Sequence, residues 1–142
     1  MNVDNKITLK FLSLSTNESF ARSVISCFAL QLNPSISEIS DIKTAVSEAV
    51  TNAIVHAYVG RVGEITIEAW TDKNVIHINI SDNGIGIENV KQALEPFYTT
   101  KEGEERSGMG FTIMQNFMDG FEVFSQPNVG TRIYMCKKIK VN

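Results

Sequence analysis

Two neighbouring segments of alternating apolar and polar residues, 64–70 and 75–81, constrain the fold of this chain most strongly. In the second segment Ile76, Ile78 and Ile80 occupy every other position, which is the period of a strand with one buried face. Only the polar residues 71–74 separate the two segments, a spacing typical of a hairpin. The middle of the chain is therefore predicted to form an antiparallel pair of strands.

The remaining elements follow from the periodicity on either side of this hairpin. Ser15 and Glu18 have the spacing of a capping box at the start of a helix. The predicted elements outside the hairpin are strands at 7–11, 121–125 and 131–138, and helices at 15–33, from 35–37 to 58–63, at 88–94 and at 111–118. This order predicts an α/β fold, a two-layer sandwich with a mixed, largely antiparallel sheet covered on one face by helices. Residues 1–142 are expected to form a single domain.

Composition limits the possible functions. The chain of 142 residues has 13 Lys and Arg against 16 Asp and Glu, a net charge of −3, and it contains no run of basic residues. Direct nucleic-acid binding is therefore disfavoured, because phosphate neutralisation needs a clustered basic face. Cys27 and Cys136 are far apart and indicate neither a zinc site nor a disulfide framework. No apolar run could span a membrane, and we expect a cytoplasmic protein without membrane contact.

A polar stripe on the second predicted helix is the first candidate for a functional site. Glu48, Asn52 and His56 are spaced at i, i+4 and i+8, which places them on one side of the helix. One interpretation is a solvated boundary of the buried face. The other is a site in which Glu48 is a general base and Asn52 provides an oxygen to Mg²⁺, with His56 as a boundary residue.

Two glycine-containing segments are further candidates. Asp82-x-Gly84-x-Gly86 directly follows a predicted strand, where glycines allow a ligand to approach the backbone and Asp82 could accept a hydrogen bond from an amino group. Gly108-Met109-Gly110 opens the helix at 111–118, and free N–H groups at a helix start suit phosphates. The preceding loop, 99–110, supplies hydroxyls and cations that could close over a phosphate chain. Each segment alone is also compatible with an ordinary turn or solvated loop.

Taken in chain order, these motifs resemble the boxes of the GHKL ATPase and kinase superfamily, which has the Bergerat fold. The matching segments are Glu48-x-x-x-Asn52, Asp82-x-Gly84-x-Gly86, 97–101, Gly108-Met109-Gly110 and Gly130-Thr131. Over the whole chain, the segments 17–22, 46–53 and 106–112 make it similar to a narrower family, the sporulation anti-sigma factors that are serine kinases.

The resemblance implies an ATP and Mg²⁺ site. Asp82 would bind the adenine amino group, Thr131 would line the adenine pocket, Asn52 would hold Mg²⁺ and Glu48 would activate the attacking hydroxyl. Residues 99–110 would form a lid, with Arg106 on the terminal phosphate. The implied nucleotide-binding residues are Asn52, Asp82, Gly84, Gly86, Thr99, Thr100, Lys101, Arg106, Ser107, Gly108, Met109, Gly110, Phe111, Thr112 and Thr131.

The resemblance also implies protein partners. Members of this family form homodimers, capture a sporulation sigma factor and phosphorylate a serine of a STAS-type anti-anti-sigma protein, and Glu18 and Arg22 match their docking surface. Three alternatives stay open: a non-catalytic, nucleotide-gated sequestrant of a sigma factor, a plain ATPase, and a histidine-kinase-like ATPase module. The last is disfavoured because His56 and His77 are followed by Ala57 and Ile78, whereas an acceptor histidine is followed by an acidic residue.

Overall fold

The computed structural model describes residues 2–95 and 110–140, and its centre is an open five-stranded sheet. The strands lie in the order β1-β2-β3-β5-β4, and every neighbouring pair is antiparallel. Their bounds are β1 Asn5–Leu12, β2 Glu64–Asp72, β3 Val75–Asp82, β4 Gly120–Gln126 and β5 Gly130–Lys138. The predicted sheet is thus confirmed, including the central hairpin of β2 and β3.

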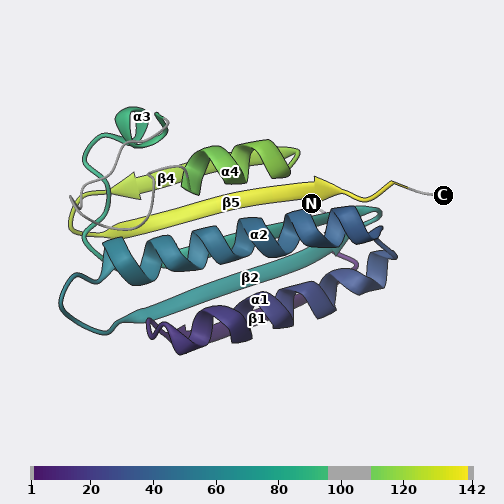
Figure 1. The fold of residues 1–142 in the computed structure, drawn as a ribbon, viewed down its shortest axis with the longest axis horizontal. Helices are drawn as coiled ribbons and strands as arrows, with labels where there is room; N and C mark the ends of the chain where they lie inside the picture. The colour runs from purple at the N-terminus through teal and green to yellow at the C-terminus, as the bar shows by residue number, and fades with distance from the viewer. Residues whose placement is uncertain (1, 96–109, 141–142) are drawn as a thin grey trace.

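The long helices cover one face of this sheet (Figure 1). They are α1 Thr16–Ala29, α2 Ile36–Asn52 and α4 Gly110–Phe117, while a short helix, α3 Val90–Ala93, lies at one end of the sheet. The last turn of α2 continues as a π-helical segment, Ala53–Ala57. The predicted two-layer sandwich is confirmed. Within the described ranges, no helix combines the length and apolar character that crossing a membrane would require.

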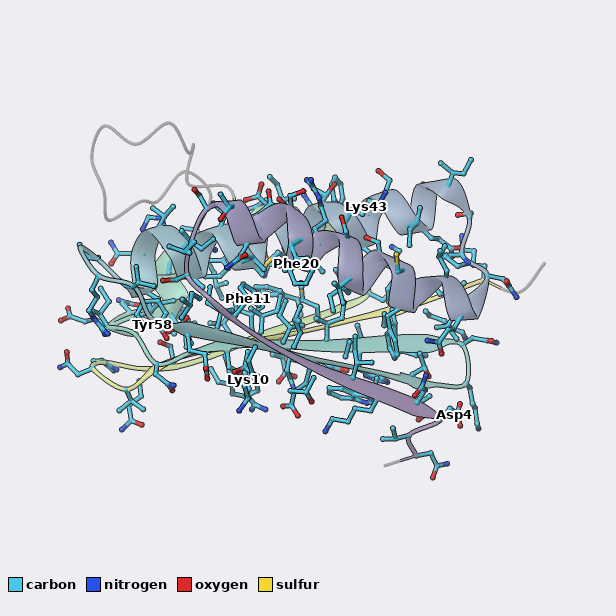
Figure 2. The ribbon with its side chains drawn as sticks, turned by 90° about the horizontal axis from the view of Figure 1, so that it is seen from below. Asp4, Lys10, Phe11, Phe20, Lys43 and Tyr58 are labelled. Carbon is cyan, nitrogen blue, oxygen red and sulfur yellow. The ribbon has the colours of Figure 1, made fainter. Side chains whose placement is uncertain are left out.

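Strand alternation builds the core between these two layers. Ile65 and Ile67 of β2 and Ile76 and Ile78 of β3 are fully buried at alternate positions. In β1, Phe11 points toward the helices and the neighbouring Lys10 points away from them (Figure 2). Because successive side chains of a strand point to opposite faces, the apolar period read from the sequence fixes which face the helices cover.

The predicted capping box at Ser15 is wrong. The backbone of Ser15 is helical (φ −57°, ψ −30°) and its side chain makes no capping hydrogen bond, because a cap residue needs an extended backbone to fold its hydroxyl back over the first turn. A capping box exists instead at the start of α2. There the Ser35 hydroxyl accepts from the Glu38 N–H at 3.0 Å, and the Ser35 N–H donates to the Glu38 carboxylate at 2.8 Å.

Candidate functional site

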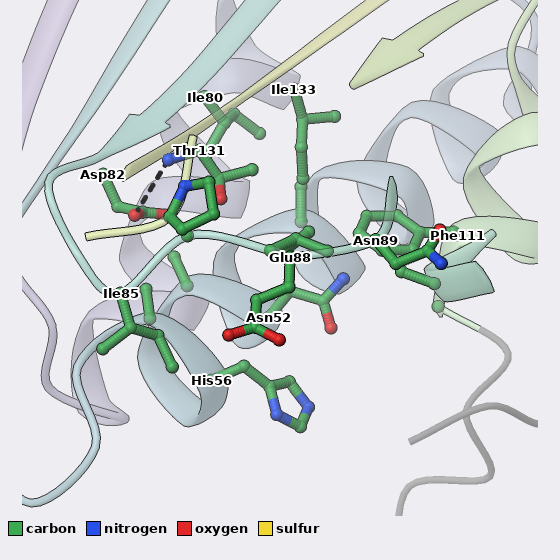
Figure 3. Close-up of a pocket in the computed structure, with 18 of the residues that line it drawn as sticks. Asn52, His56, Ile80, Asp82, Ile85, Glu88, Asn89, Phe111, Thr131 and Ile133 are labelled. Atoms are coloured by element: carbon green, nitrogen blue, oxygen red, sulfur yellow. Dashed lines mark hydrogen bonds between the residues drawn. The ribbon is translucent and has the colours of Figure 1, made fainter. Parts of the chain in front are cut away.

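A cavity of about 480 Å³ opens between α2, the segment that follows β3, the first residues of α4 and the turn between β4 and β5 (Figure 3). Its volume lies in the range of small-molecule sites, roughly 300–1,000 Å³. The cavity therefore lies on the side of the sheet that the helices cover, near the end of the sheet where Asp82 and Thr131 pair.

The walls of the cavity are small and apolar. Ala49, Ala53 and Ala57 line it from α2 and its π-helical turn, and Ile80 and Ile133 line it from the neighbouring strands β3 and β5. Alanines spaced four residues apart leave a shallow furrow along a helix, because their side chains extend no further than Cβ. A furrow facing a flat isoleucine floor suits a planar ring with little polar surface on its faces.

Asp82 provides the polar end of the cavity. Its Oδ1 accepts hydrogen bonds from the N–H of Gly84 at 2.9 Å and from the N–H of Thr131 at 3.3 Å. Burial raises the pKa of this carboxyl group, and the two backbone hydrogen bonds oppose that rise. Since both of the bonds from described residues are made to Oδ1, the lone pairs of Oδ2 remain for a ligand. The arrangement presents a fixed acceptor to a donor group such as an amine.

Two glycines hold the segment after Asp82 against its neighbours. Gly84 is buried, and a Cβ at this position would overlap the carbonyl oxygen of Ala57, which accepts a hydrogen bond from the Ile85 N–H at 3.0 Å. Gly86 has a φ of +73°, and a Cβ there would overlap the carbonyl oxygen of Gln126. The two glycines therefore allow the backbone of this segment to lie close to the backbones of Ala57 and Gln126. Gly86 also lines the cavity, whereas Gly84 does not.

Two side-chain hydroxyls also hold the segment that follows Asp82 in place. Tyr58, which is 4% exposed, donates to the carbonyl of Glu64 at 2.6 Å and accepts from the N–H of Asn83 at 2.7 Å. Ser125 accepts from the N–H of Ile87 at 2.7 Å. Backbone groups on both sides of the glycine motif are thereby tied to the sheet and to the end of α2. Sequence analysis singled out neither Tyr58 nor Ser125.

The polar stripe on α2 is only partly directed into the cavity. Asn52 and His56 line it, and both lie beside Glu88 in Figure 3. Glu48, one helical turn before Asn52, is half-buried and does not line the cavity. His56, expected to be a boundary residue, is half-buried and forms part of the wall, because the π-helical turn carries it there together with Ala57.

The other predicted nucleotide-binding residues divide into two groups. Thr131, Gly110 and Phe111 line the cavity, and Thr112 is half-buried without lining it. The remaining predicted residues lie outside the described part of the chain: Thr99, Thr100, Lys101, Arg106, Ser107, Gly108 and Met109. The expected lid falls on the same residues. The helix that this segment was predicted to open is present and begins at Gly110.

Sequence analysis missed Glu88 and Asn89, which line the cavity. Asn89 is the N-cap of α3, where its side chain accepts from the N–H of Gln92 at 3.0 Å. Asn is one of the residue types preferred at an N-cap, and Asn89 directly before the predicted helix could have been recognised as one. No such signal marks Glu88. It lines the cavity because the glycine segment before it directs the chain back toward α2.

Glu18 and Arg22, the predicted docking residues, lie on α1 and do not line the cavity. Their side chains form an i, i+4 ion pair with an N–O distance of 3.7 Å, and both are partly exposed. The predicted docking residues and the cavity are therefore carried by different helices.

Comparison with known proteins places this fold in one class. Residues 13–137 match the model of the histidine kinase-like ATPase domain. Two solved structures with 15% sequence identity share the fold: the RsbU and RsbW domains of a Mycobacterium tuberculosis protein (TM-score 0.67, covering 95% of this chain and 32% of that one) and the catalytic domain of the histidine kinase ThkA (TM-score 0.55, covering 94% and 96%).

Sequence relatives narrow the class. An anti-sigma F factor of Caldanaerobacter subterraneus subsp. tengcongensis is 56% identical over 142 residues, covering 100% of this chain and 99% of the relative. An anti-sigma F factor of Clostridium perfringens is 55% identical over 138 residues, covering 96% and 99%. The chain therefore belongs to the histidine kinase-like ATPase family and, within it, to the anti-sigma F factors. Membership of an ATPase family implies nucleotide binding.

Proposed function

We propose that this protein is an anti-sigma factor that binds Mg·ATP in the cavity and phosphorylates a serine of a STAS-type anti-anti-sigma protein. The observation that carries the proposal is the position of Asp82, a partly buried acceptor beside the apolar floor of Ile80 and Ile133. A purine has flat apolar faces and polar edges, and the cavity offers surfaces of both kinds. The family of the chain supports ATP as the nucleotide.

The described residues fit the adenine half of ATP. Asp82 would accept a hydrogen bond from the exocyclic amino group through Oδ2, and the ring would lie between Ile80, Ile133 and the alanines of α2. The hydroxyl of Thr131 lies beside Asp82 at the same edge. These contacts would bind and orient the base before any transfer takes place.

Asn52 and Glu48 are assigned to the transfer step. Bound Mg·ATP supplies a transferable phosphoryl group whose negative charge the cation neutralises. The side-chain oxygen of Asn52, on the cavity wall, would hold the cation, because Mg²⁺ prefers oxygen ligands and keeps several waters. Glu48 lies one helical turn away and would accept the proton of the serine hydroxyl as it attacks.

The partners of the proposed function act on other surfaces. The relatives are named as factors that act against sigma F, and we propose that this chain captures a sporulation sigma factor through the α1 surface with Glu18 and Arg22. We also propose that the chain forms homodimers, that it acts in the cytoplasm and that it does not bind nucleic acid directly.

A nucleotide-gated sequestrant of the sigma factor that does not transfer phosphate is the second candidate function, because Glu48 does not line the cavity.

Transfer of labelled γ-phosphate from Mg·ATP to a STAS-fold protein from the same organism tests the proposal. The wild type should label a serine, and Glu48→Gln should reduce the rate about 10²–10⁴-fold while retaining ATP binding. Glu122→Gln is the control, because Glu122 is exposed on β4 and does not line the cavity. ATP binding without serine labelling in the wild type would favour the sequestrant. Release of inorganic phosphate in the absence of an acceptor protein would favour the plain ATPase.

A further inference from the structure

Glu88 is the second carboxylate of the cavity and lies at its mouth. It is exposed to solvent and also lines the cavity, so it is placed where the cavity opens. It comes from the segment after β3, and Figure 3 shows its side chain beside those of Asn52 and His56 from the facing wall. Among the described residues none forms a hydrogen bond or ion pair with the Glu88 carboxylate, so its charge is available to a ligand.

The charged side chains around the cavity are of one sign. Asp82 and Glu88 are the acidic residues that line it, and no lysine or arginine within residues 2–95 and 110–140 does so. Asp82 already has a role in the proposed function, because Oδ1 accepts two backbone N–H groups and Oδ2 is assigned to the amino group of adenine. Glu88 is therefore the negative charge that the rest of the nucleotide meets.

A carboxylate at this position acts in opposite ways on a nucleotide with and without its cation. The phosphate chain of free ATP is negative and is repelled by a nearby carboxylate, whereas a bound Mg²⁺ is attracted to it. Mg²⁺ keeps several waters when it binds to a protein, and a carboxylate can accept hydrogen bonds from these waters. Asn52, on the facing wall, has a neutral side chain and adds no such repulsion toward free ATP.

We propose that Glu88 makes nucleotide binding depend on the cation. It attracts the Mg²⁺ of Mg·ATP, through the waters on the metal, from the side of the cavity that faces Asn52, and it repels ATP that carries no cation. The inference rests on the proposed function, because it assumes that Mg·ATP occupies the cavity with its cation at Asn52. In this role Glu88 selects the form of the nucleotide that binds and takes no part in the transfer of phosphate.

Calorimetry with ATP in the presence of Mg²⁺ and, separately, of EDTA tests the proposal. The measured quantity is the ratio of the two affinities. Glu88→Gln keeps the size of the side chain and removes its charge, so the ratio should fall about 10- to 100-fold, the effect typical of losing an outer-shell partner of a metal. Part of this fall should come from tighter binding of ATP without the cation. Loss of a merely structural contact would not produce that gain.

Glu95→Gln is the matched control. Glu95 is exposed and lies seven residues further along the same segment of the chain, but it does not line the cavity. The substitution removes the same charge from the protein, so the ratio should stay at the wild-type value. If Glu95→Gln lowered the ratio as much as Glu88→Gln, the effect would come from net charge and the proposed role of Glu88 would be refuted.

The outcomes separate this inference from the proposed function. If the wild type binds Mg·ATP and Glu88→Gln keeps the same ratio, the role of Glu88 is refuted and the nucleotide site stands. Equal weakening of ATP binding with and without Mg²⁺ would also refute it, because Glu88 would then contact the nucleotide itself or support the cavity wall. If the wild type binds ATP under neither condition, the inference and the proposed function both fail.

Discussion

Replacing Asp82 by asparagine should change nucleotide affinity and protein stability in opposite directions. The side-chain oxygen of asparagine can take the place of Oδ1 and still accept the N–H groups of Gly84 and Thr131, which lie 2.9 and 3.3 Å away. The NH₂ group then replaces Oδ2 and faces the amino group of adenine, donor against donor. The backbone around the site is retained while the hydrogen bond to the ligand is lost.

The expected loss of affinity follows from that single hydrogen bond. A hydrogen bond to a charged acceptor contributes about 1.5–3 kcal/mol, so Asp82→Asn should weaken ATP binding by about 10- to 150-fold, as measured by calorimetry. Asp119→Asn is the matched control, since Asp119 is exposed and does not line the cavity. Equal affinity of wild type and Asp82→Asn for ATP would refute the assignment of the adenine pocket.

The effect on stability has the opposite sign. Burial raises the pKa of Asp82 in the folded state, so the native protein holds this proton more tightly than the unfolded chain does. The contribution of Asp82 to the free energy of unfolding is fully present below the pKa that its carboxyl group has in the unfolded chain. It is lost as the pH rises through the raised pKa of the folded state. Asp82→Asn has no such loss, and its melting temperature relative to wild type should rise with pH over that window. A difference in melting temperature that falls with pH would contradict the reasoning.

Three further predictions concern the residues that support the site and the proposed docking residue Arg22. Gly84→Ala should lower the melting temperature and weaken ATP binding, because its Cβ would overlap the carbonyl oxygen of Ala57; a variant with both properties of the wild type would count against the close packing. Ser35→Ala should cost about 0.5–2 kcal/mol in denaturant unfolding with unchanged ATP affinity, since it removes only a helix cap, and an unchanged midpoint would contradict the capping box. Arg22→Ala should weaken sigma-factor capture in a pull-down while calorimetry with ATP is unchanged, and normal capture would exclude Arg22 from the docking surface.

The sequence predicted the architecture well because local periodicity determines it. Alternation at Ile76, Ile78 and Ile80 marks both the strand and its buried face, and the structure confirms it. Caps were harder to assign. Ser15 and Ser35 are both followed three residues later by glutamate, and the two differ in backbone conformation, which is helical at Ser15 and extended at Ser35.

The candidate site was predictable where a single segment carries the signal. Asp82 ends β3 and Gly86 lies in the segment after it, and Asn52 belongs to a helical stripe. Tyr58 and Ser125 could not be found in this way, because their partners Asn83 and Ile87 lie 25 and 38 residues away and meet them only after the sheet has formed.

The measurement that tests the account most directly is a titration of isotopically labelled protein with Mg·ATP, followed by the chemical shifts of backbone amides. Gly86, Thr131, Gly110 and Asn52 all line the cavity. If the cavity is the nucleotide site, the largest changes in chemical shift should fall on the amides of these residues. The amide of Trp70, on the sheet face away from the helices, should not shift. Changes concentrated around Trp70, with the cavity amides unmoved, would contradict the account.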